Sequence, residues 1–538
     1  MSGRVLLFGL DGATFTVLDD LVKRGVMPYL GRFMAEGARG PLMSTIPPLT
    51  PPAWITLVTG RSPGVHGITN FLQYESDDSR YVRVVSSRQI CAETIWSIVG
   101  RQGLRAGTLN FVAHSPPPKI NGYVIPGWVP WRWVKKHSRP AGLVDRLKTE
   151  IPGFDVKELA MNFDEEEKAI SGATHEDYEP WIDLHIRRER QWFHVLRHQM
   201  EHDPCELTAI VFDGVDKLQH LLWQYLDPAR EPSEPSDAFI RTRKRCWDYF
   251  RQLDDFLAES VALAGSDAHV LVASDHGFTG TTKILYMNTW LEREGYLTWA
   301  PGTAITPHDS QILGDGQPRH LTAFDLSKTR AFAASASNNG IQIPIAGIRG
   351  SEGISACEYE SFREELIDAS LTRCVDPDSG EPLIDHVWTR EEIFAGPKMD
   401  LAPDLTVSLR DAGFFSVFRA NTVVRPRPVV MGTHHPQGVF LAHGPGVRQG
   451  VQLEPLHLLD IAPTLLYLLG LPVPEDLEGR VALEVFSPEY VESCDWSYGP
   501  ATAGAGVRES PDGGGVMEKD EEGNAQVLMR LRALGYIE

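Results

Sequence analysis

Cysteine is scarce in this sequence, and the few cysteines are not arranged in a way that would bind a metal or form a disulfide framework. Six occur in 538 residues, widely scattered, and no two of them form a C-x-x-C pair. A thiolate metal site and a small disulfide-stapled fold are therefore excluded. We expect all six side chains to be reduced thiols.

The sequence also lacks long apolar segments. No uninterrupted apolar run is long enough to span a bilayer. The amino terminus, residues 1–4, leads directly into an apolar strand without the h-region and small-residue cleavage site of a signal peptide. We therefore expect a cytoplasmic protein that has no membrane partner.

Positive charge is in short supply. The chain has 51 Lys and Arg against 72 Asp and Glu, which gives a formal net charge of −21. A nucleic-acid polymer needs a broad basic face, so we do not expect one as a partner. A small anionic substrate is still compatible with this charge, because metals and nearby arginines set the field of a site locally. The sequence does not indicate the oligomeric state.

What the sequence does contain, three times, is a short apolar run that leads into an aspartate. The runs and their acids are 5–10 with Asp11, 209–212 with Asp213 and Asp216, and 270–274 with Asp275. Apolar runs of this kind are typical of buried strands in a parallel sheet, and ligands of open α/β folds collect at the carboxyl ends of such strands. We expect these acids to meet in one crevice.

Histidines stand close to two of these acids. Asp216 and His220 have i, i+4 spacing, so a helix that starts near Asp216 would place both side chains on one face. His276 directly follows Asp275, and Gly277 would allow the strand to break there. Carboxylate together with neutral imidazole selects a borderline divalent metal. The pattern therefore predicts a metalloenzyme with an α/β fold.

The remaining sequence predicts a large catalytic core that is interrupted by insertions. Periodic apolar positions predict helices near 28–37, 94–100, 236–264 and 460–470. The prolines at 47, 48, 51 and 52 exclude a strand interior and predict a proline-rich loop that contains Thr50. The expected parts are core segments at 1–127, 207–299 and 426–493, an inserted cap at 128–206, a second irregular insertion at 300–425, and a flexible tail with a short terminal helix at 494–538.

Several segments, in order, resemble the alkaline phosphatase superfamily, and within it the type I phosphodiesterase/nucleotide pyrophosphatase-like branch of bacterial predicted phosphohydrolases or phosphomutases. The matching segments are 9–13, 50–54 with 59–68, Asp216 with His220, 274–277, 432–434, 460–464 and 531–536. The resemblance implies a three-layer αβα fold of the alkaline phosphatase type, with a mostly parallel central sheet and inserted cap regions.

The resemblance also implies a two-metal site. One ion would be held by Asp216, His220 and His434, and the second by Asp11, Asp275 and His276, with Thr50 between them as nucleophile and ligand. We favour His434 over the adjacent His435 as ligand, and we do not expect Asp213 to be a ligand. Zn²⁺ is the expected ion, and Mn²⁺ or Fe²⁺ would also suit Asp/His ligands.

The resemblance therefore implies a hydrolase of small phosphate mono- or diesters that forms a phospho-Thr50 intermediate. A threonine hydroxyl is a poor nucleophile until it is activated, and a metal pair stabilises the entering and leaving oxygens of an in-line displacement. Alternatives are a phosphomutase or nucleotide pyrophosphatase of the same superfamily, or a metal-retaining binding protein with weak catalysis. A sulfatase is disfavoured, because residues 50–54 lack its C-x-P-x-R motif.

Overall fold

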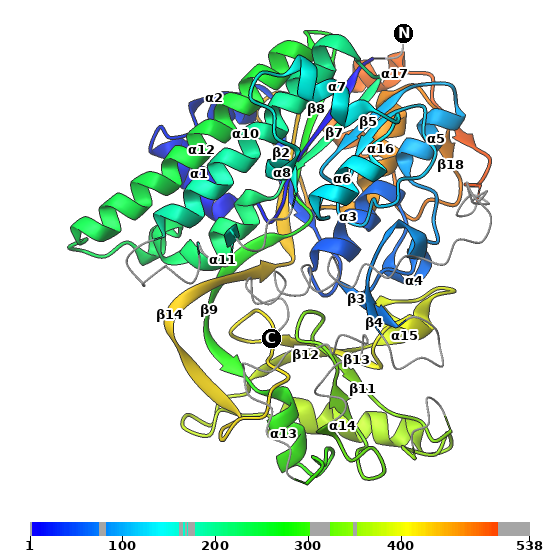
Figure 1. Cartoon of the computed structure of the whole chain (residues 1–538). Helices are drawn as coiled ribbons and strands as arrows, with labels where there is room; N and C mark the ends of the chain where they lie inside the picture. The colour runs from blue at the N-terminus through cyan, green and yellow to red at the C-terminus, as the bar shows by residue number, and fades with distance from the viewer. Residues whose placement is uncertain are drawn as a thin grey trace. The chain divides into compact units, whose positions relative to one another are not determined.

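The computed structural model describes residues 3–74, 82–160, 165–166, 169, 178–301, 323–347 and 352–503. Contacts within the chain divide it into two compact units, and Figure 1 shows the elements of both. Unit 1 takes its described residues from Met1–Ser62, Ser86–Phe278 and His435–Glu518, and unit 2 takes them from Pro63–Val85 and Thr279–His434. The domain boundaries expected from the sequence remain predictions.

Unit 1 is built on a nine-stranded sheet in the order β16-β2-β15-β8-β1-β7-β5-β6, with β17 also paired to β2. The central strands β8, β1, β7, β5 and β6 are parallel, whereas β15 is antiparallel to both β2 and β8. The mostly parallel sheet confirms the predicted fold class. The bounds are β1 (Val5–Leu10), β2 (Ala38–Met43), β5 (Ala106–Leu109), β6 (Gly122–Ile125), β7 (Leu207–Phe212), β8 (His269–Ala273), β15 (Gln437–His443), β16 (Val451–Gln452) and β17 (Leu456–His457).

Helices cover both faces of this sheet, which gives the three layers that the sequence resemblance implies (Figure 1). On one side α10 (Glu179–His202) packs along α12 (Asp237–Ala264), where the rings of Phe193 and Phe256 stack with centroids 4.1 Å apart. On the other side α3 (Thr50–Thr59), α5 (Ile95–Arg101) and α16 (Ile461–Leu468) pack together. The outer layers thereby bury the continuous apolar strands from both sides.

The helices predicted near 28–37, 94–100, 236–264 and 460–470 are all present. The longest, α12, begins after Ser236, whose side chain accepts a hydrogen bond from the Phe239 backbone N–H, and ends at Gly265. Serine before the first helical residue and glycine after the last are common at helix ends. The other helices of unit 1 are α1 (Phe15–Lys23), α2 (Pro28–Glu36), α6 (Trp131–His137), α7 (Leu143–Glu150), α8 (Val156–Leu159), α11 (Gly214–Leu226) and α17 (Pro488–Ser493).

The proline-rich segment around Thr50 is not a loop, as the sequence suggested, but the start of a helix. α3 begins at Thr50, and Pro51 and Pro52 lie in its first turn. Proline is tolerated there because the first backbone N–H groups of a helix have no partner within the helix. All ten residues of α3 are buried, so the helix lies in the interior of the unit.

Unit 2 contains a four-stranded sheet in the order β10-β11-β13-β12 and a ribbon formed by β9 and β14. The predicted insertion at 300–425 is therefore more regular than its sequence suggested. Leu405 of β13 and Leu366 of α14 are fully buried in its apolar core. The bounds are α4 (Pro63–His66), β3 (Leu72–Tyr74), β4 (Val82–Val84), β9 (Gly277–Leu285), α13 (Met287–Arg293), β10 (Phe332–Ala333), β11 (Gly340–Gln342), α14 (Tyr359–Arg373), β12 (Ile384–Thr389), α15 (Arg390–Ile393), β13 (Leu405–Leu409) and β14 (Val424–His435).

Part of the predicted tail is structured. Strand β19 (Tyr498–Gly499) pairs with β18 (Val473–Pro474), whereas the predicted terminal helix lies outside the described residues. The six cysteines, all within the described ranges, are free thiols, as expected.

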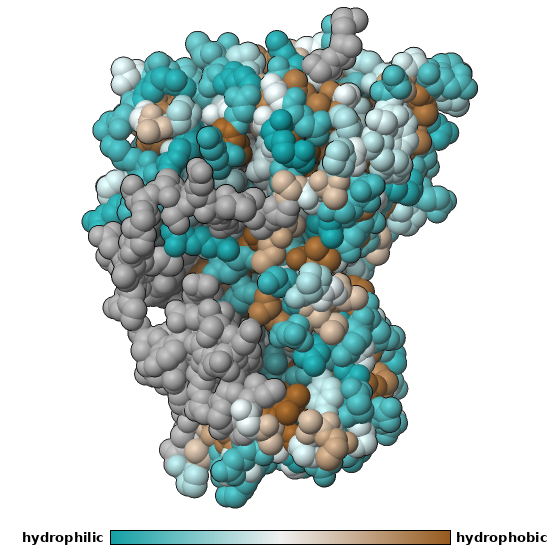
Figure 2. Space-filling view, turned by 90° about the vertical axis from the view of Figure 1, so that its right-hand side faces the viewer, coloured by the Kyte–Doolittle hydropathy of each residue, from teal (hydrophilic) through white to brown (hydrophobic). Residues whose placement is uncertain are grey.

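The described surface seen in Figure 2 is largely hydrophilic, with hydrophobic side chains in separate patches. Among the helices that the structure describes, none combines the length and the apolar character needed to cross a membrane.

Candidate metal centre

The sheet order places the acid-bearing strand ends next to one another. β1 lies between β8 and β7, and Gly9 is in register with Ala273 on one side while Leu10 is in register with Phe212 on the other. Asp11 follows β1 directly, and Asp275 follows β8 after one residue. β7 leads into α11, whose first turn carries Asp216. The three carboxylates, all buried, therefore come from three adjacent strands.

Asp11, Asp275 and His276 form the first candidate ligand group. One ligand atom of each residue lies within 4.8 Å of the others. His276 Nε2 is 3.3 Å from Asp275 Oδ2 and 3.6 Å from Asp11 Oδ1. His276 Nδ1 is 3.1 Å from the Gly277 carbonyl oxygen, so the proton lies on Nδ1 and the lone pair lies on Nε2. The imidazole is thus in the tautomer that a metal ligand needs.

The unpaired oxygens of these carboxylates fit a metal ion. Asp11 Oδ1 and Asp275 Oδ2 are buried and accept no hydrogen bond from any residue that the structure describes. Their partner oxygens do accept one: the Trp54 indole N–H lies 3.4 Å from Asp11 Oδ2, and the Gly12 backbone N–H lies 3.1 Å from Asp275 Oδ1. Buried oxygens without partners are costly, and a cation beside His276 Nε2 would satisfy both.

The electrostatics of the group lead to the same conclusion. Burial raises the pKa of Asp11 well above its ordinary value, and the charges of Asp275 and Asp216 raise it further. Burial likewise raises the pKa of Asp275, against the lowering effect of the Gly12 hydrogen bond. Burial thus makes the charged form of these carboxyls unfavourable, and a divalent ion beside them would offset that penalty.

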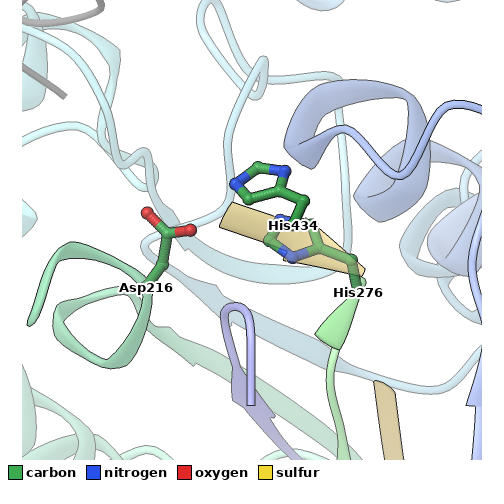
Figure 3. A group of neighbouring side chains, drawn as sticks. All are labelled: Asp216, His276 and His434. Atoms are coloured by element: carbon green, nitrogen blue, oxygen red, sulfur yellow. The ribbon is translucent and has the colours of Figure 1, made fainter. Parts of the chain in front are cut away.

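Asp216, His276 and His434 form the second candidate group, and Figure 3 shows the three side chains turned toward one another. One ligand atom of each again lies within 4.8 Å of the others. His276 therefore belongs to both groups, whereas the sequence assigned it to a single ion. His220 is in neither group, although its Nε2 lies 3.3 Å from Asp216 Oδ1. Its role as the third ligand beside Asp216 remains a prediction.

The structure distinguishes the two adjacent histidines at the end of β14. His434 is buried, and its ring lies edge-on to that of Phe414 at 5.3 Å between centroids. The Nδ1 of His435 instead accepts a hydrogen bond from the Gln437 backbone N–H. His434, and not His435, belongs to a candidate ligand group of the described residues, and its role as the ligand remains a prediction.

Thr50 lies beside the first group, at the amino-terminal end of α3. Its hydroxyl Oγ1 is fully buried and 3.2 Å from His276 Nε2, to which it donates its proton. The helix start presents the positive end of its dipole, which favours negative charge on Thr50 or on a phosphate bound there. The arrangement of a hydroxyl, carboxylates and an imidazole is suited to nucleophilic phosphoryl transfer.

Two aromatic residues of the centre were not predicted from the sequence. Trp54 lies one helical turn after Thr50 in α3. This i, i+4 spacing places it on the same helix face as Thr50, and it is the sequence signal that could have placed Trp54 in the centre. Phe278 packs its ring edge-on to His220, with centroids 4.9 Å apart. It also excludes any side chain at Gly12, whose φ is +69° and whose Cβ would come within 2.8 Å of the Phe278 ring.

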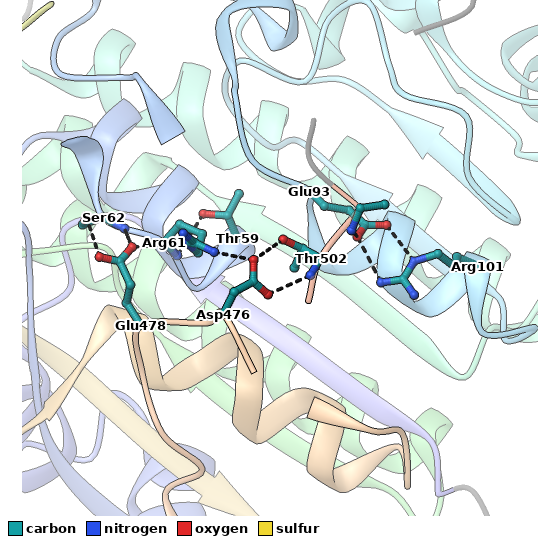
Figure 4. A network of polar contacts seen from close by, with 9 residues as sticks. Thr59, Arg61, Ser62, Glu93, Arg101, Asp476, Glu478 and Thr502 are labelled. Atoms are coloured by element: carbon teal, nitrogen blue, oxygen red, sulfur yellow. Dashed lines mark hydrogen bonds and ion pairs between the residues drawn. The ribbon is translucent and has the colours of Figure 1, made fainter. Parts of the chain in front are cut away.

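A polar network fixes the other end of α3 (Figure 4). Arg61 Nη1 lies 2.6 Å from Asp476 Oδ2, and the Ser62 backbone N–H donates to Glu478 at 2.6 Å. Asp476 also accepts a hydrogen bond from the Thr502 backbone N–H. Partly exposed pairs of this kind contribute little individually, but they connect the helix that carries Thr50 to a distant chain segment.

Comparison of the sequence with models of protein families shows which family the chain belongs to. Residues 5–437 match the family model described as type I phosphodiesterase/nucleotide pyrophosphatase. The chain belongs to this family. It is therefore a phosphoester hydrolase of the alkaline phosphatase superfamily, whose members depend on metals, and the resemblance seen in the sequence is confirmed.

Solved structures share the fold at low sequence identity. Murine ectonucleotide pyrophosphatase/phosphodiesterase 5 has 16% identity and a TM-score of 0.51, over 90% of this chain and 100% of that one. Phosphonoacetate hydrolase from Sinorhizobium meliloti 1021, in complex with phosphonoformate, has 16% identity and a TM-score of 0.50, over 87% and 95% of the two chains. No curated protein matches the sequence.

Proposed function

We propose that this phosphodiesterase-family protein is a two-metal hydrolase of small phosphoesters that uses Thr50 as its nucleophile. Asp11, Asp275 and His276 would hold one ion, and Asp216, His220 and His434 the other. The unpaired Asp11 and Asp275 oxygens support the first assignment. When bound, the ions would supply positive charge next to the attacking and leaving oxygens.

In the proposed reaction Oγ1 of Thr50 forms a bond to phosphorus while the bond from phosphorus to the leaving oxygen breaks. The Thr50 hydroxyl loses its proton, and the leaving oxygen takes one up and departs as an alcohol. A water molecule then hydrolyses phospho-Thr50, which releases phosphate from a monoester or a phosphomonoester from a diester. The α3 amino terminus favours the phosphoryl group on Thr50.

The observation that carries this proposal is the 3.2 Å separation of Thr50 Oγ1 from His276 Nε2. Thr50→Ala should therefore abolish turnover of p-nitrophenyl and bis-p-nitrophenyl phosphate while the metal content stays unchanged. Thr50→Ser should keep part of the activity. Acid-quenched enzyme analysed by peptide mass spectrometry should carry a phosphoryl group on Thr50 and on no other residue.

Thr59→Ala is the matched control, because Thr59 is a buried threonine of the same helix whose hydroxyl donates to the Ile55 carbonyl at 2.6 Å. It should retain close to wild-type activity. Full activity of Thr50→Ala, or a phosphoryl group elsewhere, would overturn the nucleophile assignment. A protein that binds both metals but turns over no phosphoester would instead be the metal-retaining binding protein.

The proposed substrate is a small phosphoester. The phosphonoformate bound by the Sinorhizobium structure is likewise a small anion with a tetrahedral phosphorus, although it is a phosphonate and not an ester. The ratio of monoester to diester rates separates a phosphatase from a phosphodiesterase or nucleotide pyrophosphatase. Release of free phosphate, rather than its transfer within the substrate, separates a hydrolase from a phosphomutase. Zn²⁺ is the ion we propose, and reloading the apo-protein separately with Zn²⁺, Mn²⁺ and Fe²⁺ tests this.

A further inference from the structure

Asp213, the residue directly after β7, binds two buried cations. Its Oδ1 lies 2.6 Å from Arg188 Nη1 of α10, and its Oδ2 accepts from Lys217 Nζ of α11. Asp213 and Lys217 are fully buried, and Arg188 is 3% exposed. Because both carboxylate oxygens are engaged by cations of the protein itself, Asp213 is a counter-ion and not a metal ligand.

These contacts converge on the first turn of α11. Gly214 donates its backbone N–H to Glu189 Oε1 of α10 at 2.7 Å. No side chain fits at Gly214, since a Cβ there would lie 2.6 Å from the Tyr249 hydroxyl. The Lys217 ammonium, besides its bond to Asp213, lies over the Trp128 ring at 5.6 Å from the centroid. The start of α11 is thus held by charge on one side and by close packing on another.

The same turn carries Asp216, and the next one carries His220. Asp216 is adjacent to Lys217 in the sequence, so a helix turn that keeps Lys217 on Asp213 also fixes the direction of the Asp216 side chain. The i, i+4 spacing then fixes His220 relative to Asp216. A ligand set needs its members held to a fraction of an ångström, and supporting contacts supply that precision.

We propose that Arg188, Asp213 and Lys217 form a buried charge cluster whose function is to position Asp216 and His220 for metal binding. They are positioning residues, because they act on Asp216 and His220 through the start of α11, and Asp213 is in neither candidate ligand group. The inference rests on the proposed function in one respect, namely that Asp216 and His220 bind one of two ions. It predicts that loss of the cluster weakens the binding of that ion and leaves the ion at Asp11, Asp275 and His276 in place.

The test is the metal content of the full-length protein after equilibration with Zn²⁺ and gel filtration, measured by mass spectrometry of the metal. Wild type should retain two ions per chain, and Asp213→Asn should retain one, with the affinity of the second ion reduced about tenfold to a hundredfold. Co²⁺ substitution should show the loss of one of two visible absorption components. These readouts do not depend on activity.

Asp254→Asn is a matched control. Asp254 is also a buried aspartate, and its oxygens accept the backbone N–H groups of Tyr29 and Leu30 at the start of α2. It should lower the melting temperature without changing the metal content. If Asp213→Asn does not fold, Lys217→Arg and Lys217→Met decide, since only the arginine keeps a positive charge for Asp213. Arginine should retain two ions and methionine one.

Each outcome discriminates. Two ions of unchanged affinity in Asp213→Asn, or equal metal content in the two Lys217 variants, overturn the inference. Equal loss of both ions in Asp213→Asn also overturns it, because the cluster would then support the fold in general. A wild type that binds fewer than two ions contradicts the proposed function instead.

Discussion

Two sets of buried carboxylates stand at neighbouring strand ends of the same sheet, and they are balanced in different ways. Asp213 is matched by Arg188 and Lys217, whose cationic groups reach both of its oxygens. Asp11 and Asp275 instead accept hydrogen bonds from N–H groups, among them those of Trp54 and Gly12, and each keeps one oxygen that accepts no hydrogen bond among the described residues.

The difference shows how a protein can reserve a place for a cation. A buried ion pair that the chain provides is a closed arrangement, and removing one partner is strongly destabilising. Buried carboxylates without a cation of their own destabilise the metal-free protein. Binding of an ion removes this destabilisation, so metal binding and folding are coupled. Geometry alone does not separate the two sets, whereas charge balance does.

The largest expected effect comes from removing a carboxylate of the unbalanced set. Asp275→Asn should lower kcat/KM about 10⁴-fold, or by about 5 kcal/mol, because the charge that a metal supplies at phosphorus is lost with it. The same substitution should make the metal-free protein more stable, since it removes a buried negative charge. Steady-state kinetics measures the loss of kcat/KM, and chemical unfolding in EDTA measures the gain in stability of the metal-free protein.

Asp213→Asn should have the opposite effect on the metal-free protein. It removes the carboxylate that Arg188 and Lys217 share, although the charges of Glu166 and Glu189 still act on Arg188. The free energy of unfolding should fall by about 3–5 kcal/mol. Urea titrations of both variants in EDTA measure the contrast directly. Destabilisation of the metal-free protein by Asp275→Asn and Asp213→Asn alike would show that charge balance does not distinguish the two sets.

The stability of the metal-free protein should also depend on pH. The pKa values of Asp11 and Asp275 are raised in the folded state, so the folded protein holds more protons than the unfolded chain above about pH 4. Stability should therefore fall as pH rises above that value, by about 1 kcal/mol per pH unit. Zn²⁺ should remove this slope. An EDTA-treated protein whose melting temperature rises with pH in the same window would contradict the raised values.

The smallest effect should come from Trp54→Phe, which removes the hydrogen bond to Asp11 and keeps the ring. The change should cost about 1 kcal/mol in metal affinity, or about fivefold. Trp96→Phe is the matched control, since its indole N–H donates to His114 Nε2 at 2.8 Å, outside both ligand groups. Equal metal affinities of the two variants would show that the Trp54 hydrogen bond to Asp11 does not contribute to metal binding.

The sequence was sufficient for the sheet and for most of the candidate ligands, because both are marked locally. An apolar run that ends in an acid marks a buried strand end, and i, i+4 spacing marks Asp216 and His220 on one helix face. No local sequence pattern indicates that His276 belongs to two groups, because this depends on the position of His434 at the end of β14 in the folded protein. Likewise Arg188, one of the two cationic partners of Asp213, lies 25 positions earlier in the sequence, in α10.

Thr50 shows the limit most clearly. Four nearby prolines exclude a strand, but they suit a turn as well as the first turn of a helix. The choice between the two is made by the burial of all ten residues of α3, which is a property of the folded unit. The sequence motif therefore singled out Thr50 as a candidate, and tertiary packing determined its conformation.

The central place of β1 in its sheet has a consequence for synthesis on the ribosome. β1 is made before every other strand of its sheet, yet its neighbours β7 and β8 begin only at Leu207 and His269. At 5–20 residues per second, a nascent chain waits roughly 10–40 s before the first of them is made. Over that interval an apolar strand has no partner on either edge, so chaperones that bind extended apolar segments should associate with the nascent chain early.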